Sequence, residues 1–275
     1  MSLKKVNNSV KYWDSHRNTI HSRKGGWKIG QGVHCHGYSL MDDLAGEISY
    51  FQLHLLYILG YIPEKKLADW VEAVHVCMSW ADPRIWCNQV GALAGTAQTR
   101  VVAAITAGIM AADSTMYGTL PLLDGAKFIQ DALLKKKAGY TAGDILDEEI
   151  RKHRGKINIT GYARPIASGD ERVVAMERIT NQLEFERGEH LTLAFELDQM
   201  LRETYGESIN INGYASAFLS DQGFNSETIY RISAICIMSG VAACYIEEQD
   251  KTPFSFLPLR CDDVVYAGNP ARDLP

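Results

Sequence analysis

The sequence predicts an all-α protein, and three observations carry that prediction. Apolar residues recur three or four positions apart over most of the chain, which is the spacing of one helix face. Strand-like patterns are limited to Val33 and to Val264-Val265-Tyr266. The 275 residues, of which 46% are hydrophobic and 22% charged, suffice for a large core without disulfide or metal staples and are unlike a disordered chain.

In the first third of the chain, the sequence predicts an irregular segment followed by three helices. Residues 1–37 contain five glycines that mark turns, so an irregular segment is expected there. Two short helices fit residues 39–60 and end at Gly60. A third helix fits residues 64–80 and ends before Asp82-Pro83.

Residues 89–112 are rich in alanine and glycine, and Arg100 is their only charged residue. A helix that is apolar on all sides is a buried one, so one long buried helix is expected here. Asn225-Ser226 is a cap signal for the last helix of the chain. Six further helices are expected, at residues 124–136, 141–154, 172–185, 190–205, 212–223 and 226–249.

Charge and hydropathy disfavour several classes of function. The 28 basic and 33 acidic residues give a net charge of −5, which disfavours sequence-independent nucleic-acid binding but leaves room for a local basic patch. No apolar run approaches the roughly 20 residues that cross a bilayer. Residues 1–15 are polar and unlike a secretory signal, so the prediction is a cytoplasmic protein.

The cysteine and histidine patterns predict reduced thiols and no metal site. The six cysteines include no C-x-x-C. Cys236 and Cys244 would lie about 12 Å apart along one helix, which is too far for a disulfide bond. His34 and His36 flank Cys35, but such a pair alone is a weak metal signal.

Several short segments carry a resemblance to a known family. Gly161-Tyr162-Ala163-Arg164-Pro165, followed by Asp170-Glu171-Arg172, resembles the G-[FY]-G-H-P and D-P-R segment of the citrate synthase family. The resemblance covers residues 33–268, and the chain is close in length to compact citryl-CoA lyase-like forms. Its other landmarks follow the family's order: His36-Gly37-Tyr38 is similar to R-G-Y, residues 49–63 to S-F and LL-x-G-x-L-P, residues 118–126 to G-P-L-H-G-G-A, residues 210–214 to N-V-D-F-Y, and residues 260–268 to R-P-x-x-x-Y-x-G.

The resemblance implies an all-α homodimer whose active sites lie in a cleft between a large and a small domain. The expected organisation is an N-terminal arm at 1–37, a large helical domain made of 38–155 and 206–275, and a small helical domain at 156–205. The apolar helix at 89–112 suits the subunit interface that this implies, or else the core of a single subunit.

The resemblance also implies the co-substrate. A CoA thioester is expected near Gly161, Tyr162 and Ala163, and no cofactor is expected to be bound permanently. The remaining partners are a second copy of the chain and a small carboxylate.

The residues that perform the family's chemistry are replaced in this chain. Condensation of acetyl-CoA with a keto acid needs a base for the methyl protons and donors for the enolate and carbonyl oxygens. By the resemblance, the family's two histidines and its aspartate fall on Leu123, Arg164 and Asn212. Leucine donates nothing and an amide cannot take up the methyl proton, whereas arginine still polarises a carbonyl. Ordinary citrate synthesis is therefore expected to be slow, because each lost acid–base group costs about 10²–10⁴ in rate.

The anion-binding arginines are better kept. Arg172 matches the D-P-R arginine and Arg260 the terminal R-P arginine, while a third falls on Ile237. The planar fork of arginine suits a carboxylate, so Arg164 and Arg172 are expected to hold a carboxylate or phosphate. The alternative is an ordinary ion pair with a nearby acid such as Asp170.

Two aspartates are candidates for the missing base. Asp82 lies where the family's substrate-binding histidine region is expected, and Trp86 and His36 are further candidates for substrate contact. The alternative for Asp82 is a helix cap with aromatic packing. Asp124 directly follows Leu123, although one helix step of about 100° turns its carboxylate away from the histidine's direction.

Two hypotheses about function result. The first is an enzyme that makes or cleaves a carbon–carbon bond between a CoA-type thioester and a carboxylate with rewired acid–base residues. The second is a non-catalytic homologue that binds a carboxylate or CoA metabolite or a partner protein. The replaced residues favour the second hypothesis, and the retained arginines favour the first.

Overall fold

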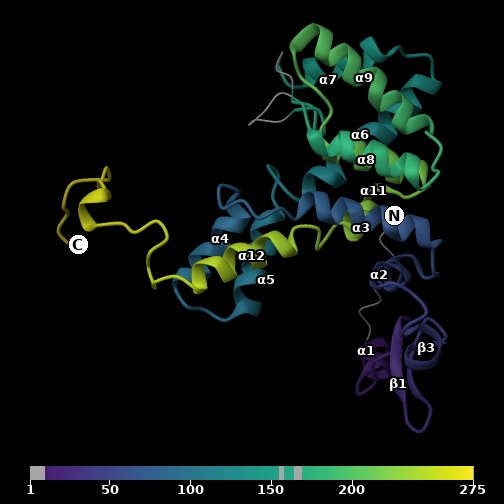
Figure 1. The fold of residues 1–275 in the computed structure, drawn as a ribbon, viewed down its shortest axis with the longest axis horizontal. Coiled ribbons are helices and arrows are strands. Elements are labelled where there is room, and N and C mark those ends of the chain that lie inside the picture. Colours follow the sequence, from purple (N-terminus) through teal and green to yellow (C-terminus); the bar gives the residue numbers. More distant parts are fainter. Residues whose placement is uncertain (1–9, 155–157, 164–168, 275) are drawn as a thin grey trace. The chain divides into compact units, whose positions relative to one another are not determined.

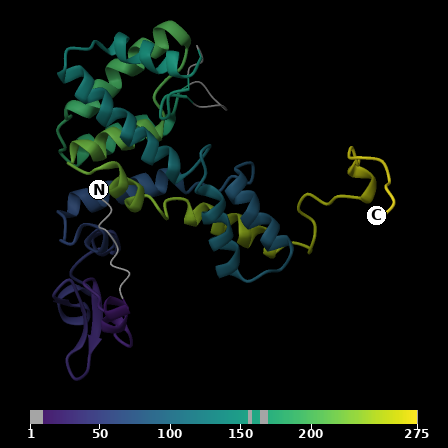
Figure 2. The ribbon, with the colours of Figure 1, turned by 180° about the vertical axis from the view of Figure 1, so that it is seen from behind.

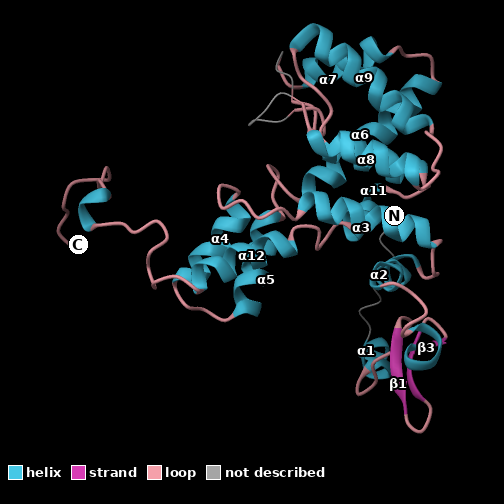
Figure 3. Cartoon of the chain, in the orientation of Figure 1, coloured by secondary structure: helices cyan, strands magenta, loops and turns pink. Residues whose placement is uncertain are grey.

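The computed structural model describes residues 10–154, 158–163 and 169–274, and the chain divides into two compact units, Met1–Ala68 and Asp69–Pro275 (Figure 1). Helices predominate, and among the described residues strands occur only between residues 25 and 39 (Figure 3). The predicted all-α class is confirmed. No helix among these residues is long and apolar enough to span a lipid bilayer. The expected domain boundaries stay predictions.

The first unit begins with a helix and a small antiparallel sheet, where the sequence predicts an irregular segment. The strand order is β1-β2-β3, and Val33 lies in a strand as predicted. The strands have two to four residues, which is too short for an alternating pattern to stand out, and Gly30 and Gly32 adopt positive φ to close the hairpin. The elements are α1 (Val10–His16), β1 (Gly25–Lys28), β2 (Gly32–Cys35), β3 (Tyr38–Ser39), the short π-helix η1 (Leu40–Leu44) and α2 (Tyr50–Leu59).

Helix α2 begins and ends where its sequence indicates. Ser49 and Gln52 form a capping box at its start, and Gly60 ends it at a φ of 89°. Cys35 and Leu56 are buried together in the small core of this unit.

The second unit contains the remaining helices, in two groups. Helix α3 includes the boundary between the units. The helices are α3 (Lys65–Met78), α4 (Trp86–Thr96), α5 (Val101–Ala112), α6 (Thr119–Lys137), α7 (Ala142–Lys152), α8 (Glu171–Gln182), α9 (Glu189–Tyr205), α10 (Ile211–Asp221), α11 (Ser226–Ile232), α12 (Met238–Gln249) and the 3-10 turn η2 (Cys261–Asp263).

The first group is formed by α4, α5 and α12, which pack side by side (Figures 1 and 2). A Cβ on Gly95 would lie 2.3 Å from the carbonyl oxygen of Tyr245, so glycine is needed for this approach. The single helix predicted for residues 89–112 is wrong. It is two helices, because Gln98 adopts a φ of 57° and the Thr99 hydroxyl donates to the carbonyl of Ala94.

The second group surrounds α10, which packs against α6, α8, α9 and α11. Every residue of α10 from Gly213 to Ser220 is buried. Trp70 of α3 stacks on Phe218 at 3.8 Å between ring centroids, and its indole N–H donates to the Thr180 hydroxyl of α8. Helix α10 is therefore the fixed centre of this group.

Two other predictions need correction. The helix predicted for residues 226–249 is two, α11 and α12, separated by a turn in which the Ser233 hydroxyl donates to the carbonyl of Ile229. Asn225 caps α11 as predicted. Residues 264–266 are exposed and form no strand, because no neighbouring strand pairs with them in the described part of the chain.

Candidate active site

Three segments that carry the predicted site residues meet at the amino end of α10. Asn210 caps the helix, since its side-chain oxygen accepts from the backbone N–H groups of Asn212, at 2.9 Å, and Gly213, at 3.2 Å. The Asn210 backbone N–H donates to the carbonyl of Gly161 at 2.8 Å, and its amide nitrogen donates to the carbonyl of Ala163 at 2.6 Å. One asparagine thus joins the loop to the helix.

Two glycines make this contact close. Gly161 has a φ of 97°, and a Cβ there would lie 2.7 Å from the Cα atom of Gly213. A Cβ on Gly213 would lie 2.3 Å from the carbonyl oxygen of Gly161. Both positions therefore require glycine, and the loop and the helix touch through their backbones.

Asp170 and Arg172 form the third part of the site. The Arg172 guanidinium grips the Asp170 carboxylate with Nε at 2.8 Å and Nη2 at 2.7 Å. The Asp170 side chain is fully buried, and Arg172 is 14% exposed. Asp170 also accepts from the backbone N–H of Ile211 at 2.9 Å, which ties the amino ends of α8 and α10 together.

The charge state of Asp170 follows from these contacts. Burial alone would raise the pKa of this carboxyl group, but the hydrogen bonds and charge of Arg172 and the N–H group of Ile211 outweigh burial. The pKa of Asp170 is therefore below its usual range. The alternative role that the sequence leaves open for Arg172, an ion pair with Asp170, is present in the structure.

Two polar atoms beside the loop have no hydrogen-bond partner among the described residues. They are the side-chain oxygen of Asn212 and the hydroxyl of Tyr162. The Tyr162 ring packs edge-on against Phe128 of α6, and burial raises the pKa of its phenol. Buried polar atoms are normally paired, so these two atoms are exceptions within the well-packed second group.

The predicted residue Arg164 lies outside the described residues. Its neighbour Ala163 is held by Asn210. Sequence reasoning missed Asn210 as a site residue and treated Asp170 only as an alternative partner. The available signal was local, because Asn210 lies two positions before the helix predicted at residues 212–223 and asparagine is a common helix cap.

Asp82 lies in a separate turn before α4. Arg84 holds its carboxylate through Nη2 at 2.6 Å and Nε at 3.1 Å, and these hydrogen bonds lower the pKa of Asp82. Trp86 begins α4, is 47% exposed and meets the ring of Tyr117 edge-on at 6.4 Å. Burial raises the pKa of Tyr117 to about 12, although the charge of Arg172 opposes the shift.

The other predicted residues have partners outside the amino end of α10. Asp124 is on α6, is 52% exposed and pairs with Lys127 at 3.1 Å. Arg260 is exposed, and its backbone N–H donates to Asp263. His36 belongs to the first unit, where its ring lies 6.3 Å from that of Tyr57.

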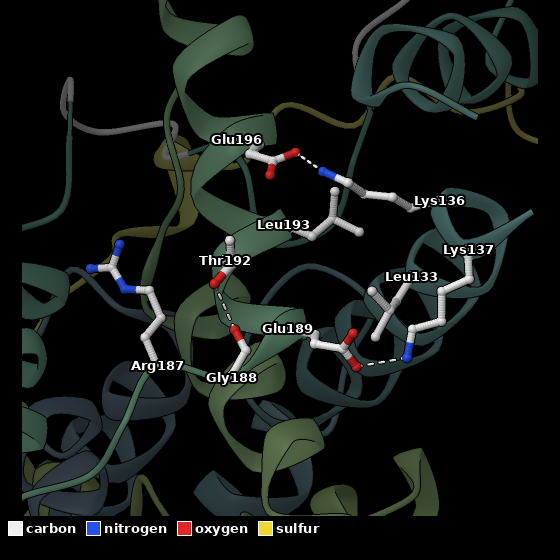
Figure 4. A pocket seen from close by; sticks show the side chains of 9 residues that line it. All are labelled: Leu133, Lys136, Lys137, Arg187, Gly188, Glu189, Thr192, Leu193 and Glu196. Carbon is white, nitrogen blue, oxygen red and sulfur yellow. Dashed lines mark hydrogen bonds and ion pairs between the residues drawn. The ribbon is translucent and has the colours of Figure 1, made fainter. Parts of the chain in front are cut away.

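A surface groove between α6 and α9 contains none of these residues (Figure 4). Lys137 pairs with Glu189 at 2.6 Å, and Lys136 pairs with Glu196. Its lysines are thus neutralised by glutamates of the facing helix, and the groove offers a ligand no uncompensated lysine.

Comparisons with known proteins give a match by structure alone. No family model and no curated protein matches the chain. Citryl-CoA lyase from Hydrogenobacter thermophilus shares its fold with a TM-score of 0.77 and 24% sequence identity, over 93% of this chain and 97% of that chain. ATP citrate lyase from Methanosaeta concilii, solved with (3S)-citryl-CoA, has a TM-score of 0.75 and 16% identity over 97% of this chain.

Citrate synthase from Thermotoga maritima has a TM-score of 0.60 and 17% identity over 83% of this chain. The match spans 45% of the ATP citrate lyase chain and 60% of the citrate synthase chain. The chain therefore has the citrate synthase-like fold that the sequence resemblance implies.

Proposed function

We propose that the chain is an enzyme of the citryl-CoA lyase or citrate synthase type, which cleaves or makes a carbon–carbon bond between a CoA thioester and a carboxylate. The observation that carries the proposal is the amino end of α10, where the loop at residues 158–163, the Asp170–Arg172 turn and Asn212 meet. These are three of the segments that resemble the citrate synthase family. The fold shared with citryl-CoA lyase over nearly all of both chains supports it.

Cleavage of a citryl thioester requires three groups. A base removes the hydroxyl proton, the carbon–carbon bond breaks with its electron pair passing to the thioester enolate, and an acid returns a proton to the enolate carbon. A donor stabilises the enolate oxygen. The Asn212 amide can donate to such an oxygen but cannot take up a proton, so the base is another residue.

The amino end of α10 does not itself supply the anion site. The N–H groups of Ile211, Asn212 and Gly213 already donate to side-chain oxygens. A ligand carboxylate is therefore held by the N–H groups of Arg172 that do not donate to Asp170, together with Arg164 and Arg260. Asp170 occupies the Nε–Nη2 edge of the guanidinium and so orients Arg172, while Nη1 lies 3.8 Å from the Met78 sulfur. A ligand carboxylate would meet the remaining N–H groups of Nη1 and Nη2.

Asp82 and Asp124 remain the proposed bases. Asp82 is the more enclosed of the two, with 13% of its side chain exposed against 52% for Asp124. Arg84 must release the Asp82 carboxylate before it can accept a proton, because the ion pair keeps its pKa low. This supports slow turnover in the purified protein.

The test uses citryl-CoA and follows acetyl-CoA release by chromatography. We expect slow cleavage by the wild-type chain and about 10²-fold faster cleavage by Asn212→Asp, which restores a carboxylate at the position of the family's aspartate. The matched control is Asn225→Asp, the same change at the cap of α11, which should leave the rate unchanged. Binding without cleavage in both wild type and Asn212→Asp would favour the binding-protein hypothesis, and absence of citryl-CoA binding would contradict the proposed enzyme.

We further propose that a second copy of the chain covers α5. This helix carries no charged residue, yet Val102 and Met110 are each 72% exposed. Light scattering should give twice the 30.6 kDa chain mass, and Val102→Glu/Met110→Glu should give the monomer. Val174→Glu on α8, at a side chain 69% exposed, is the control that should leave the dimer intact.

A further inference from the structure

The start of the chain concentrates positive charge that the proposed chemistry does not use. Residues 1–37 contain seven basic and one acidic side chain, so their net charge is +6 in a protein of net charge −5. The acidic residue, Asp14, pairs with Arg17 at 2.7 Å. The other cations repel one another, and a bound anion would relieve this repulsion.

Several of these cations line one pocket on the sheet of the first unit. The pocket has a volume of about 510 Å³, and none of the described residues that line it is acidic. The Lys24 ammonium donates to the carbonyl of Tyr57, which fixes one cation at the rim. The lining includes Arg23, Lys24, Trp27, Lys28, His34 and His36.

The same pocket offers an aromatic surface, and one of its histidines has an unpaired ring nitrogen. Trp27 lies in β1 and is 69% exposed, so its indole ring is available for stacking. The Nε2 atom of His36 is buried and has no hydrogen-bond partner among the described residues. Gly26 and Gly37 also line the pocket, and a Cβ on either would meet no neighbouring atom, so the lining is open.

We propose that this pocket binds a nucleoside di- or triphosphate that is distinct from the CoA thioester. Arg23 and Lys28 provide charge-assisted hydrogen bonds to phosphoryl oxygens, and Trp27 stacks on the base. The volume is in the range of small-molecule sites and far below the extended track that a nucleic-acid strand needs. The proposal does not rest on carbon–carbon chemistry in the second unit, because it concerns binding alone.

The experiment is calorimetric titration of the full chain with ADP, ATP, pyrophosphate and CoA. We expect saturable binding of ADP or ATP, weakened at least tenfold in Arg23→Gln/Lys28→Gln. The matched control, Lys11→Gln/Arg17→Gln, removes the same charge from the same segment outside the pocket and should change the affinity less than threefold. All four side chains are on the surface, and circular dichroism checks that each variant folds.

A second variant separates the base from the phosphates. Trp27→Ala should weaken ADP binding about fivefold or more, the scale of one lost base stack, and leave pyrophosphate unchanged. Four results would overturn the proposal: no saturation with ADP or ATP at millimolar concentration, equal losses in the two double variants, pyrophosphate binding as tight as ADP, or CoA binding weakened tenfold in Arg23→Gln/Lys28→Gln. The last result would assign the pocket to the substrate.

Discussion

Two turns of this molecule contain the same Asp-x-Arg pattern, and the local geometry is the same in both. The arginine's backbone N–H donates to the aspartate Oδ1, at 2.9 Å in the Asp82 turn and 3.1 Å in the Asp170 turn. Its guanidinium then grips both carboxylate oxygens. The surroundings differ, because Arg84 is 83% exposed and Arg172 is 14% exposed.

The difference shows what local sequence decides and what packing decides. A short aspartate side chain two residues before an arginine is enough to form the fork. Only in the buried turn does the carboxylate also accept from another helix, through the N–H of Ile211. In the Asp82 turn the arginine is exposed, so solvent weakens the ion pair, whereas the buried pair connects two helices and orients the arginine of the proposed site.

The largest expected effect is on the free energy of unfolding when each of the two carboxylates is removed separately. Asp170→Ala leaves the Arg172 charge and the Ile211 N–H unpaired in a buried place, and we expect a loss of about 3–5 kcal/mol in the free energy of unfolding. Asp82→Ala should leave that free energy nearly unchanged. Urea unfolding of both variants measures the difference, and equal losses would show that burial does not separate the two turns.

The next largest effect on the free energy of unfolding should come from the loop at residues 158–163, which contacts α10 beside the Asp170 turn. Gly161→Ala combines strain at positive φ with a contact of 2.7 Å to Gly213, so we expect a loss of about 2–4 kcal/mol in the free energy of unfolding. Gly223→Ala at the other end of α10 has a φ of 81° and meets no neighbour, and should cost about 1–2 kcal/mol. A loss at Gly161 no larger than at Gly223 would argue against the close backbone contact.

A smaller effect is expected on ligand binding. Arg172→Lys keeps the charge but loses the planar group that grips Asp170 on one edge and presents N–H groups to a ligand on another, so binding of citryl-CoA should weaken by about 1.5–3 kcal/mol. Arg84→Lys is the matched change in the exposed turn and should leave binding unchanged. Calorimetric titration compares the two, and an unaltered affinity in Arg172→Lys would refute its role in holding the ligand.

The sequence alone predicts much of the helical frame, for a physical reason. Helix periodicity and caps are local, so the Asn225 cap and the end of α2 at Gly60 are found where expected. The helix breaks within residues 89–112 and 226–249 are not predicted from the sequence. Both depend on a hydroxyl that donates to a carbonyl four or five residues earlier, which competes only weakly with continued helix.

The site is less predictable than the frame. Arg172 can be singled out from the sequence, but one edge of its guanidinium is paired with Asp170, an alternative that spacing alone cannot decide. The contact of Gly161 with Gly213 joins residues more than fifty positions apart, and no local pattern encodes it. The sheet of the first unit is not predicted from the sequence, because its strands have at most four residues.

The smallest expected effect is on how the free energy of unfolding depends on pH, and it should differ between the two turns. Both carboxyl groups have a pKa below the unfolded value of about 3.9, so each contributes stability that is complete above that value and is lost as the pH falls through the folded pKa. At Asp82 the guanidinium that donates the hydrogen bonds is 83% exposed, so water and dissolved ions compete for it, whereas the Asp170–Arg172 pair is shielded by burial. Between pH 6 and pH 3 the free energy of unfolding of Asp170→Asn should therefore fall less steeply than that of wild type, in low and in high salt. Asp82→Asn should differ from wild type only in low salt, and the same salt dependence in both variants would remove the distinction between the buried and the exposed turn.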